Sequence, residues 1–512
     1  MGSRLAFLSI AAVAVAASGV FLIVRTGIVD DAYITLDYAR NLAFGLHWGL
    51  TPGHTANTAT SPLNVLIQGL LTAVLRRPVL ALGVLFVLSN VIVAYALLRI
   101  TRKLRLPTWS ALAGCFLVLF NPLLDSAVGL EITLSAGVMA LLLMAAVEAR
   151  PVLFGVLAGL LVLTRVDLVI FAVALVLGSP VLLRTLGKVL LAAAAISLPW
   201  FAWSWVALGS IVPDTLLIKS AQAAHQPPYA FAKSPLDLYR GFPIMTELSF
   251  LPAILGIVAL SAWAGVWVRS WFRTGPSPIS DPVDGFTPVI LLGLGGVLHY
   301  VVYSVLNAPL FHWYYSWSIV SLTYLFTLSL GALARFRDPA AGEVVGVARH
   351  QPGVAVLGLS TVLIAVAQIG YNVQHGIPWT QAAYNGNAAT PAEYAAVGLG
   401  IRPLVGNHPV RSPGEIGTIA YFCGCEILDE FSDRGISLSL LDQQRQRQGR
   451  FSRFLFDINF YFLDENLKPT PVDYVIVYAR HKPANDPSWP TTGPGWIGNG
   501  YDVLVPLSGA TR

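Results

Sequence analysis

Charged residues are scarce in this sequence. Only 12% of its 512 residues are Asp, Glu, Lys or Arg, whereas 55% are hydrophobic. Soluble globular proteins carry about 25% charged residues. A chain with so little charge and a mean hydropathy of +0.67 cannot hide its apolar surface in one soluble core, so lipid must be its solvent. The scarcity predicts a polytopic α-helical membrane protein and excludes an ordinary soluble enzyme.

Cysteine and net positive charge are scarce as well. Three cysteines, Cys115, Cys423 and Cys425, are too few for a disulfide framework. The spacing of Cys423 and Cys425 predicts no easy bridge between them, and no second pair completes a zinc site. The net charge of +5 is small for this length. Its basic residues lie in short clusters between apolar runs, which is typical of membrane orientation, so we expect no nucleic-acid partner.

Long apolar runs predict about eleven spanning helices in residues 1–372, because a span needs about 20 apolar residues. Residues 5–24 lack an A-x-A-like cleavage site before the next polar segment, so we interpret them as a retained span and not as a signal peptide. The stretch 151–182 is long enough for two short spans. The other expected spans are 79–98, 109–124, 131–147, 188–208, 248–268, 287–307, 314–334 and 352–372.

The orientation depends on whether the short apolar segment 61–75 crosses the membrane. If it does not, five basic clusters fall on one side, which agrees with the distribution of Lys and Arg in membrane proteins. We therefore favour an interfacial or re-entrant helix there, in a multi-pass protein of the plasma (inner) membrane. The outer face then holds 25–60, 125–131, 209–247, 308–313 and the chain after 372. The clusters are Arg99/Arg102/Lys103/Arg105, Arg150, Arg184/Lys188, Arg269/Arg273 and Arg335/Arg337/Arg349.

The segment 373–512 differs from the rest in its Asn, Pro, Gly and charged residues. The runs 472–478 and 501–505 have the composition of strands. We predict an extracytoplasmic soluble domain of α/β or α+β class, joined to a membrane module formed by 1–372.

The first outer loop, 25–60, combines an amphipathic helix with two adjacent carboxylates. Ile34, Tyr38 and Leu42 recur at helical spacing, which predicts a helix along the membrane interface. Asp30 and Asp31 lie at its N-terminal end. A helix cap explains one aspartate but explains two poorly, since adjacent like charges repel. We therefore interpret them as a general base, or as metal ligands, at the membrane surface.

Other polar residues of the outer face have both a structural and a functional interpretation. Arg165 and Asp167 interrupt an apolar stretch, where ionisable groups are costly and either pair or mark a site. Glu131 is either part of a helix start or a second acid of the same cavity. Lys219 is either solvated or a cation for a phosphate leaving group. The segment 311–315 is either an aromatic belt or, through His312, a phosphate or metal contact. His299, inside a span, fits a backbone contact.

The sequence resembles a known superfamily. The pattern DDAYIT…YARNLA…TSPL from Asp30 to Leu63 resembles the GT-C glycosyltransferases, and more closely the actinobacterial terminal arabinofuranosyltransferases. GSIVPDTLLIKS (209–220) and GEIGTIAY…EILDEF (414–431) are similar to further motifs of that group. Two features depart from it. Asp37 stands where the family has Arg, and Ala56-Asn57-Thr58-Ala59 replaces an acidic residue and a Gly.

The resemblance implies transfer of a sugar, arabinofuranose in the closest group, from a polyprenyl-phosphate donor to a cell-envelope glycan on the outer face. It implies an inverting displacement with Asp30 or Asp31 as base. No cofactor is certain, and Mg²⁺ or Mn²⁺ on these two carboxylates remains an alternative. A mannosyl- or other glycosyltransferase, a lipid-linked sugar transporter and a non-catalytic scaffold also remain open. The implied donor or substrate contacts are Arg40, Asn41, Glu131, Arg165, Asp167, Asp214, Lys219, His312 and Tyr314.

Overall fold

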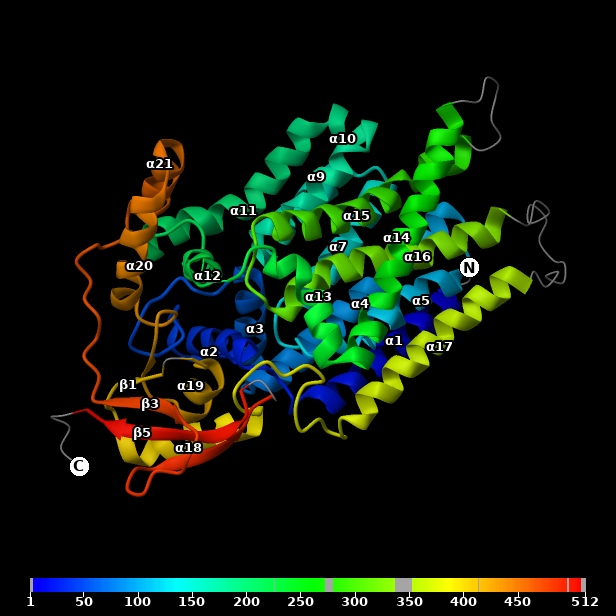
Figure 1. The fold of residues 1–512 in the computed structure, drawn as a ribbon. Coiled ribbons are helices and arrows are strands. Elements are labelled where there is room, and N and C mark those ends of the chain that lie inside the picture. The colour runs from blue at the N-terminus through cyan, green and yellow to red at the C-terminus, as the bar shows by residue number, and fades with distance from the viewer. Residues whose placement is uncertain are drawn as a thin grey trace.

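The computed structural model describes residues 3–224, 226–271, 280–336, 352–412, 414–494 and 497–507. Helices form a bundle, and a small domain with a sheet covers one end of it (Figure 1). Within the described residues, seven helices are long and apolar enough to cross a membrane, so the chain is a multi-pass membrane protein. They are α1 (Ser3–Val24), α4 (Pro78–Leu104), α11 (Leu186–Leu208), α14 (Pro243–Trp271), α15 (Ser280–Val305), α16 (Ser316–Phe336) and α17 (Pro352–Gln374).

Four further predicted spans correspond to shorter apolar helices of the bundle. Each has fewer residues than the roughly 20 that a straight span needs. They are α5 (Thr108–Leu119), α7 (Ile132–Val147), α8 (Pro151–Thr164) and α9 (Val169–Leu177). Shorter connecting helices are α6 (Pro122–Asp125), α10 (Pro180–Arg184), α12 (Thr215–Ala223) and α13 (Ala230–Gly241).

Small residues let these short helices pack closely. Gly155 and Gly159 lie one turn apart on α8 and face the backbone of α11 at Val189 and Ala193. A side chain at either glycine would collide with those carbonyl groups. Close backbone approach through small residues is the usual basis of helix association in a membrane, where lipid removes the hydrophobic driving force.

The first loop holds α2 (Asp30–Gly45) and α3 (Pro62–Leu75). Phe21, near the end of α1, packs on Phe86, near the start of α4, with ring centroids 6.2 Å apart. Helix α4 therefore starts on the side where α1 ends, and the segment that contains α3 connects these two ends. This geometry agrees with the interfacial interpretation of residues 61–75.

Basic residues gather at the end of the bundle opposite the small domain. Arg335, in the last turn of α16, donates to the carbonyl of Leu104 at the end of α4 (2.8 Å). Arg99 and Arg150 both pair with Glu148, at 2.7 and 3.0 Å. Of the predicted basic clusters, Arg273, Arg337 and Arg349 lie outside the described residues.

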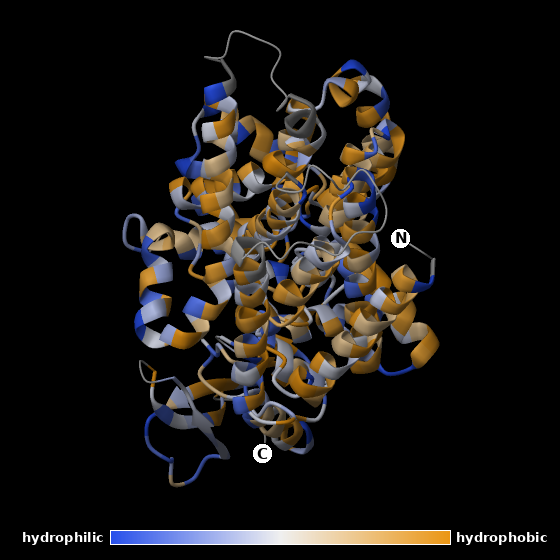
Figure 2. Ribbon diagram, turned by 90° about the vertical axis from the view of Figure 1, so that its right-hand side faces the viewer, coloured by the Kyte–Doolittle hydropathy of each residue, from blue (hydrophilic) through white to orange (hydrophobic). Residues whose placement is uncertain are grey.

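The C-terminal domain is a mixed α and β unit, as predicted. Its five-stranded sheet has the order β2-β1-β3-β5-β4, in which β1 pairs in parallel with β2 and β3, and β5 pairs antiparallel with β3 and β4. Polar colours are more frequent here than in the bundle (Figure 2). The elements are α18 (Pro391–Val405), β1 (Val410–Arg411), α19 (Gly417–Cys423), β2 (Ile427–Leu428), α20 (Arg434–Arg447), α21 (Arg450–Asn459), β3 (Tyr474–Ala479), β4 (Ser488–Thr492) and β5 (Asn499–Pro506).

The two C-terminal cysteines form a disulfide, so the prediction from their spacing is wrong. The Cα atoms of Cys423 and Cys425 lie 5.1 Å apart, within the range that a disulfide spans. Gly424 between them has a φ of +61°, a left-handed conformation that glycine adopts without steric cost. The chain turns at this glycine and brings the two thiols together.

Candidate functional site

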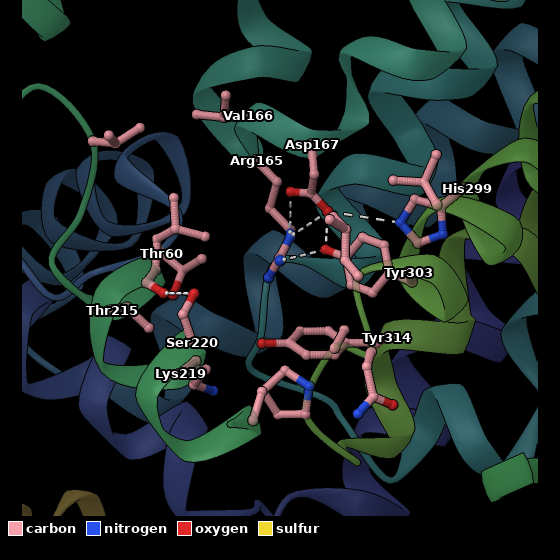
Figure 3. Close-up of a pocket in the computed structure, with 18 of the residues that line it drawn as sticks. Thr60, Arg165, Val166, Asp167, Thr215, Lys219, Ser220, His299, Tyr303 and Tyr314 are labelled. Carbon is pink, nitrogen blue, oxygen red and sulfur yellow. Dashed lines mark hydrogen bonds and ion pairs between the residues drawn. The ribbon is translucent and has the colours of Figure 1, made fainter. Parts of the chain in front are cut away.

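A cavity of about 800 Å³ opens between η1 (Val166–Leu168), α9, α12 and α15. Most of its lining is apolar, and several rim side chains are exposed, including Leu216 (65%), Val169 (44%) and Leu306 (71%). An apolar rim at a bundle surface that faces lipid allows a hydrocarbon chain to enter from the side. Figure 3 shows Arg165, Asp167, His299 and Tyr303 gathered on one side of this cavity and Lys219 on another.

Arg165 forms the centre of the first charged group. Helix α8 ends at Thr164, and Arg165 has an extended backbone (φ −164°, ψ 133°) before η1 begins. Such a break is tolerated at membrane depth where it is buried in protein or lines a cavity. The guanidinium reaches Glu131 (2.9 Å) and Asp167 (3.0 Å) and donates to the hydroxyl of Tyr303 (3.1 Å). Each of its nitrogens therefore has a partner.

Aromatic and imidazole groups complete this cluster. The Arg165 guanidinium carbon lies 4.6 Å from the ring centroid of Trp317 and 5.2 Å from that of Tyr314. The hydroxyl of Tyr303 donates to Asp167, and Nε2 of His299 lies 3.6 Å from the same carboxylate. Arg165 thus both neutralises Asp167 and lines the cavity, so the two interpretations made from the sequence hold together. These contacts use three of its five N–H groups, and two carboxylates balance its charge, so it attracts a phosphate less than an unpaired cation would.

Lys219 on α12 is the second charged group of the cavity. Its ammonium lies 4.0 Å from the ring centroid of Phe311 and 5.8 Å from that of Tyr314, and 3.6 Å from Oδ1 of Asp31. The first loop holds the start of α12, because the backbone N–H of Asp214 donates to the carbonyl of Asn57 (2.7 Å). The aromatic faces stabilise the cation without consuming its three donors.

Asp30 and Asp31 have different surroundings, although they are adjacent in the sequence. The Asp30 carboxylate is buried and accepts the backbone N–H groups of Gly417 (3.0 Å) and Thr418 (2.6 Å). It caps a helix, but the helix is α19 of the C-terminal domain and not α2. The Asp31 side chain is 29% exposed and faces Lys219. Asp31 is therefore the one with oxygens free for a substrate, a distinction that the sequence did not reveal.

Glu415 is a third carboxyl group near this pair and was not among the predicted site residues. Burial, together with the charges of Asp30 and Asp31, raises the pKa of Glu415 to about 8. Burial, partly offset by the N–H groups of α19, raises the pKa of Asp30 to about 6. The motif GEIGTIAY contains Glu415 and was the available signal. Within the described residues, no three His, Cys, Asp or Glu side chains lie close enough to hold a metal ion.

Five predicted contacts do not line the cavity, and one of them is Glu131, which pairs with Arg165 at 2.9 Å. Arg40 donates to the carbonyl of Tyr421 (2.7 Å) and to Asp37 (2.6 Å), and so joins α2 to α19. Asp214 accepts from Arg434 of the C-terminal domain (2.8 Å). The other two are Asn41, whose amide donates to backbone carbonyls of the first loop at 2.9 Å, and His312, which is buried with its ring 4.4 Å from that of Tyr384.

Two solved structures resemble this arrangement over most of the chain. ArnT from Cupriavidus metallidurans bound to undecaprenyl phosphate aligns over 98% of both chains at 14% identity, with a TM-score of 0.52. The archaeal oligosaccharyltransferase AglB from Archaeoglobus fulgidus, in complex with an inhibitory peptide and a dolichol-phosphate, aligns over 92% of this chain and 69% of its own at 12% identity, with a TM-score of 0.51.

The chain has the GT-C fold. No protein-family model matches the sequence, and no curated protein matches it either. At such low identity the GT-C fold alone is shared, and activity has to be argued from the cavity and its charged groups.

Proposed function

We propose that this protein is a membrane glycosyltransferase that transfers a sugar from a polyprenyl-phosphate donor to a cell-envelope glycan. One observation carries the proposal: a mostly apolar cavity with an exposed apolar rim is lined by the cation Lys219, whose ammonium lies 3.6 Å from the Asp31 carboxylate. A lipid-linked sugar phosphate has the same three parts, namely an apolar chain, an anionic phosphate and a reacting carbon beside it. The solved GT-C structures bound to undecaprenyl phosphate and dolichol-phosphate support this donor class.

The residues suit a single displacement at the anomeric carbon. An acceptor hydroxyl oxygen forms a bond to that carbon while the bond from the carbon to the phosphate oxygen breaks. The hydroxyl proton passes to the Asp31 carboxylate, and the electron pair of the broken bond stays on the polyprenyl phosphate. The Lys219 ammonium stabilises the charge that develops there. Arg165, engaged with two carboxylates, has the role of fixing the wall on which Tyr314 lies.

The donor sugar that we favour is arabinofuranose, on the strength of the sequence resemblance around Asp30–Leu63. A mannosyl or other sugar is the alternative. The acceptor would be a saccharide held between the membrane module and the C-terminal domain, on the outer face of the plasma membrane. The Cys423–Cys425 disulfide supports an oxidising compartment for that domain.

The test is transfer by the purified protein in nanodiscs. Radiolabelled polyprenyl-phosphoryl arabinofuranose, mannose and glucose would each be offered with a short arabinan or mannan acceptor. We expect labelled product with the arabinose donor, and its loss in Asp31→Asn. The matched control is Asp237→Asn, which changes an exposed aspartate that pairs with Arg240 at the surface. Product with only the mannose or the glucose donor would show that the donor sugar is not arabinofuranose. Absence of product with every donor would overturn the proposal.

A further inference from the structure

A second apolar surface lies on α21, away from the cavity. Phe451, Phe454 and Leu455 recur at the spacing of one helix face, and they are 74%, 60% and 50% exposed. Tyr461 and Phe462, directly after the helix, are 72% and 47% exposed. A water-exposed domain seldom presents so many large apolar side chains in one patch unless the patch binds something.

The exposure is not a consequence of a poorly packed hairpin, since the other side of α21 has its own core. Phe456 and Phe460 pack with Leu441 of α20 and with Leu217 of α12. This core fastens the α20–α21 hairpin to α12, the helix that carries Lys219. The exposed stripe of Phe451, Phe454 and Leu455 is therefore an additional surface on an otherwise satisfied hairpin.

The position of α21 places this stripe beside lipid. The indole N–H of Trp205, near the end of α11, donates to the carbonyl of Ile458 (2.8 Å), and its ring lies 5.0 Å from that of Phe462. Tryptophan is enriched where a span leaves the hydrocarbon. In Figure 1, α21 projects at the end of α11 and runs across the direction of that helix. The side chains of α11 that must face lipid are exposed to the same degree, namely Leu191 (73%), Leu198 (59%) and Val206 (64%).

Positive charge flanks the stripe. Arg447, Arg450 and Arg453 are exposed, and no acidic side chain among the described residues forms an ion pair with them. Arg445, by contrast, pairs with Asp457 and Glu465 at 2.7 and 3.1 Å. An amphipathic helix with an apolar face, flanking arginines and nearby aromatic residues has the composition of helices that lie in the membrane surface and contact anionic headgroups.

We propose that α21 is a membrane-surface anchor. Its stripe inserts into the leaflet on the side of the C-terminal domain, and Arg447 and Arg450 contact lipid phosphates. The anchor would fix the hairpin, and with it α12, at a set height above the hydrocarbon. The proposal does not depend on which reaction the cavity performs.

The test measures the depth of a nitroxide in the full-length protein in phosphatidylcholine–phosphatidylglycerol nanodiscs. Phe454→Cys supplies the labelling site, because Cys115 is buried and Cys423 and Cys425 are bonded. Lys482→Cys, in the exposed loop before β4, is the control. We expect the label at 454 to collide more with oxygen and less with a water-soluble nickel complex than the label at 482.

Two results would overturn the anchor. Nickel accessibility at 454 equal to that at 482 would mean that the stripe lies in water. Shielding from both oxygen and nickel would mean that a second copy or another protein covers it. In the background Arg447→Gln, Arg450→Gln, we expect the label at 454 to become shallower only in nanodiscs that contain phosphatidylglycerol. The same depth with and without these arginines would contradict the proposed contact of Arg447 and Arg450 with lipid phosphates.

Discussion

The two charged groups of the cavity differ in how completely their polar atoms are used. Arg165 is 8% exposed at its side chain, and each guanidinium nitrogen already has a partner. The Lys219 ammonium and the Asp31 carboxylate lie 3.6 Å apart, and their side chains are 12% and 29% exposed. This long contact leaves N–H donors of Lys219 and an oxygen of Asp31 available to a substrate. A buried cluster whose charges are already paired fixes structure, because any exchange of partners would leave a charge uncompensated. A partly exposed pair with one member on the cavity wall can exchange partners with a substrate, so we assign the chemistry to Lys219 and Asp31.

The largest expected effect separates the two adjacent aspartates. Asp31→Asn should lower transfer by about 10²- to 10⁴-fold with little change in stability, because it removes the base. Asp30→Ala should instead destabilise the protein by about 1–3 kcal/mol, because it leaves the N–H groups of Gly417 and Thr418 buried without an acceptor. Both variants would be assayed for transfer and for unfolding in mixed micelles. Equal loss of transfer with unchanged stability in both would contradict the distinction.

The next effect compares the two cations. Arg165→Met should cost about 3–5 kcal/mol of unfolding free energy, because Glu131 and Asp167 would keep their charges without a partner. Lys219→Met should cost less than about 1 kcal/mol, since its pair with Asp31 is long and partly exposed. Lys233→Met, at an exposed position of α13, is the control. The account would be wrong if the Lys219 variant were the less stable of the two.

A third effect should appear as a pH dependence of stability. The pKa values of Asp30 and Glu415 are raised to about 6 and about 8 from usual values of 3.8 and 4.5, chiefly by burial. The folded protein therefore holds these protons more tightly than the unfolded chain does. The stabilisation is complete below about pH 4 and is lost as pH rises through about 6 and about 8. Melting temperatures should fall as pH rises from about 5 to about 9. The Glu415→Gln variant should show a smaller fall near pH 8. Melting temperatures that rise with pH would contradict this prediction.

The smallest effect is expected at the exposed pair of Arg240 and Asp237, whose side chains are 78% and 62% exposed. Water screens such a pair, so Asp237→Asn should change stability by less than about 0.5 kcal/mol and leave transfer unaltered. A loss as large as that of Arg165→Met would mean that burial does not explain the difference between the two groups of the cavity.

Local patterns were sufficient for much of the fold. The apolar runs predicted the long helices, and the runs 472–478 and 501–505 predicted β3 and β5, because hydrophobic patterning is a property of neighbouring residues. The distribution of basic residues predicted an interfacial α3, and the packing of Phe21 on Phe86 agrees with that prediction. The disulfide was missed because the conformation of Gly424, not the spacing of the cysteines, decides whether the thiols meet.

The site was harder to predict because its contacts join distant parts of the chain. Asp30 and Thr418, which share a hydrogen bond, are 388 residues apart in the sequence, and the paired residues Asp214 and Arg434 are 220 residues apart. The sequence identified Asp31, Lys219 and Arg165 as polar residues of one face, but not which of them would be paired in a buried cluster. That property depends on Glu131 and Tyr303 lying within reach of one guanidinium. A resemblance over the first loop also could not reveal that Asp30 belongs to the interface with the C-terminal domain.

The most direct test of the central claim is the affinity for a polyprenyl phosphate that carries no sugar, compared with the corresponding alcohol. We predict that wild-type protein in nanodiscs prefers the phosphate, and that Lys219→Met weakens its binding by about 10- to 100-fold, the value of one charge-assisted hydrogen bond. The affinity for the alcohol should not change. Equal binding of the phosphate by wild type and Lys219→Met would contradict the claim that Lys219 holds the leaving group.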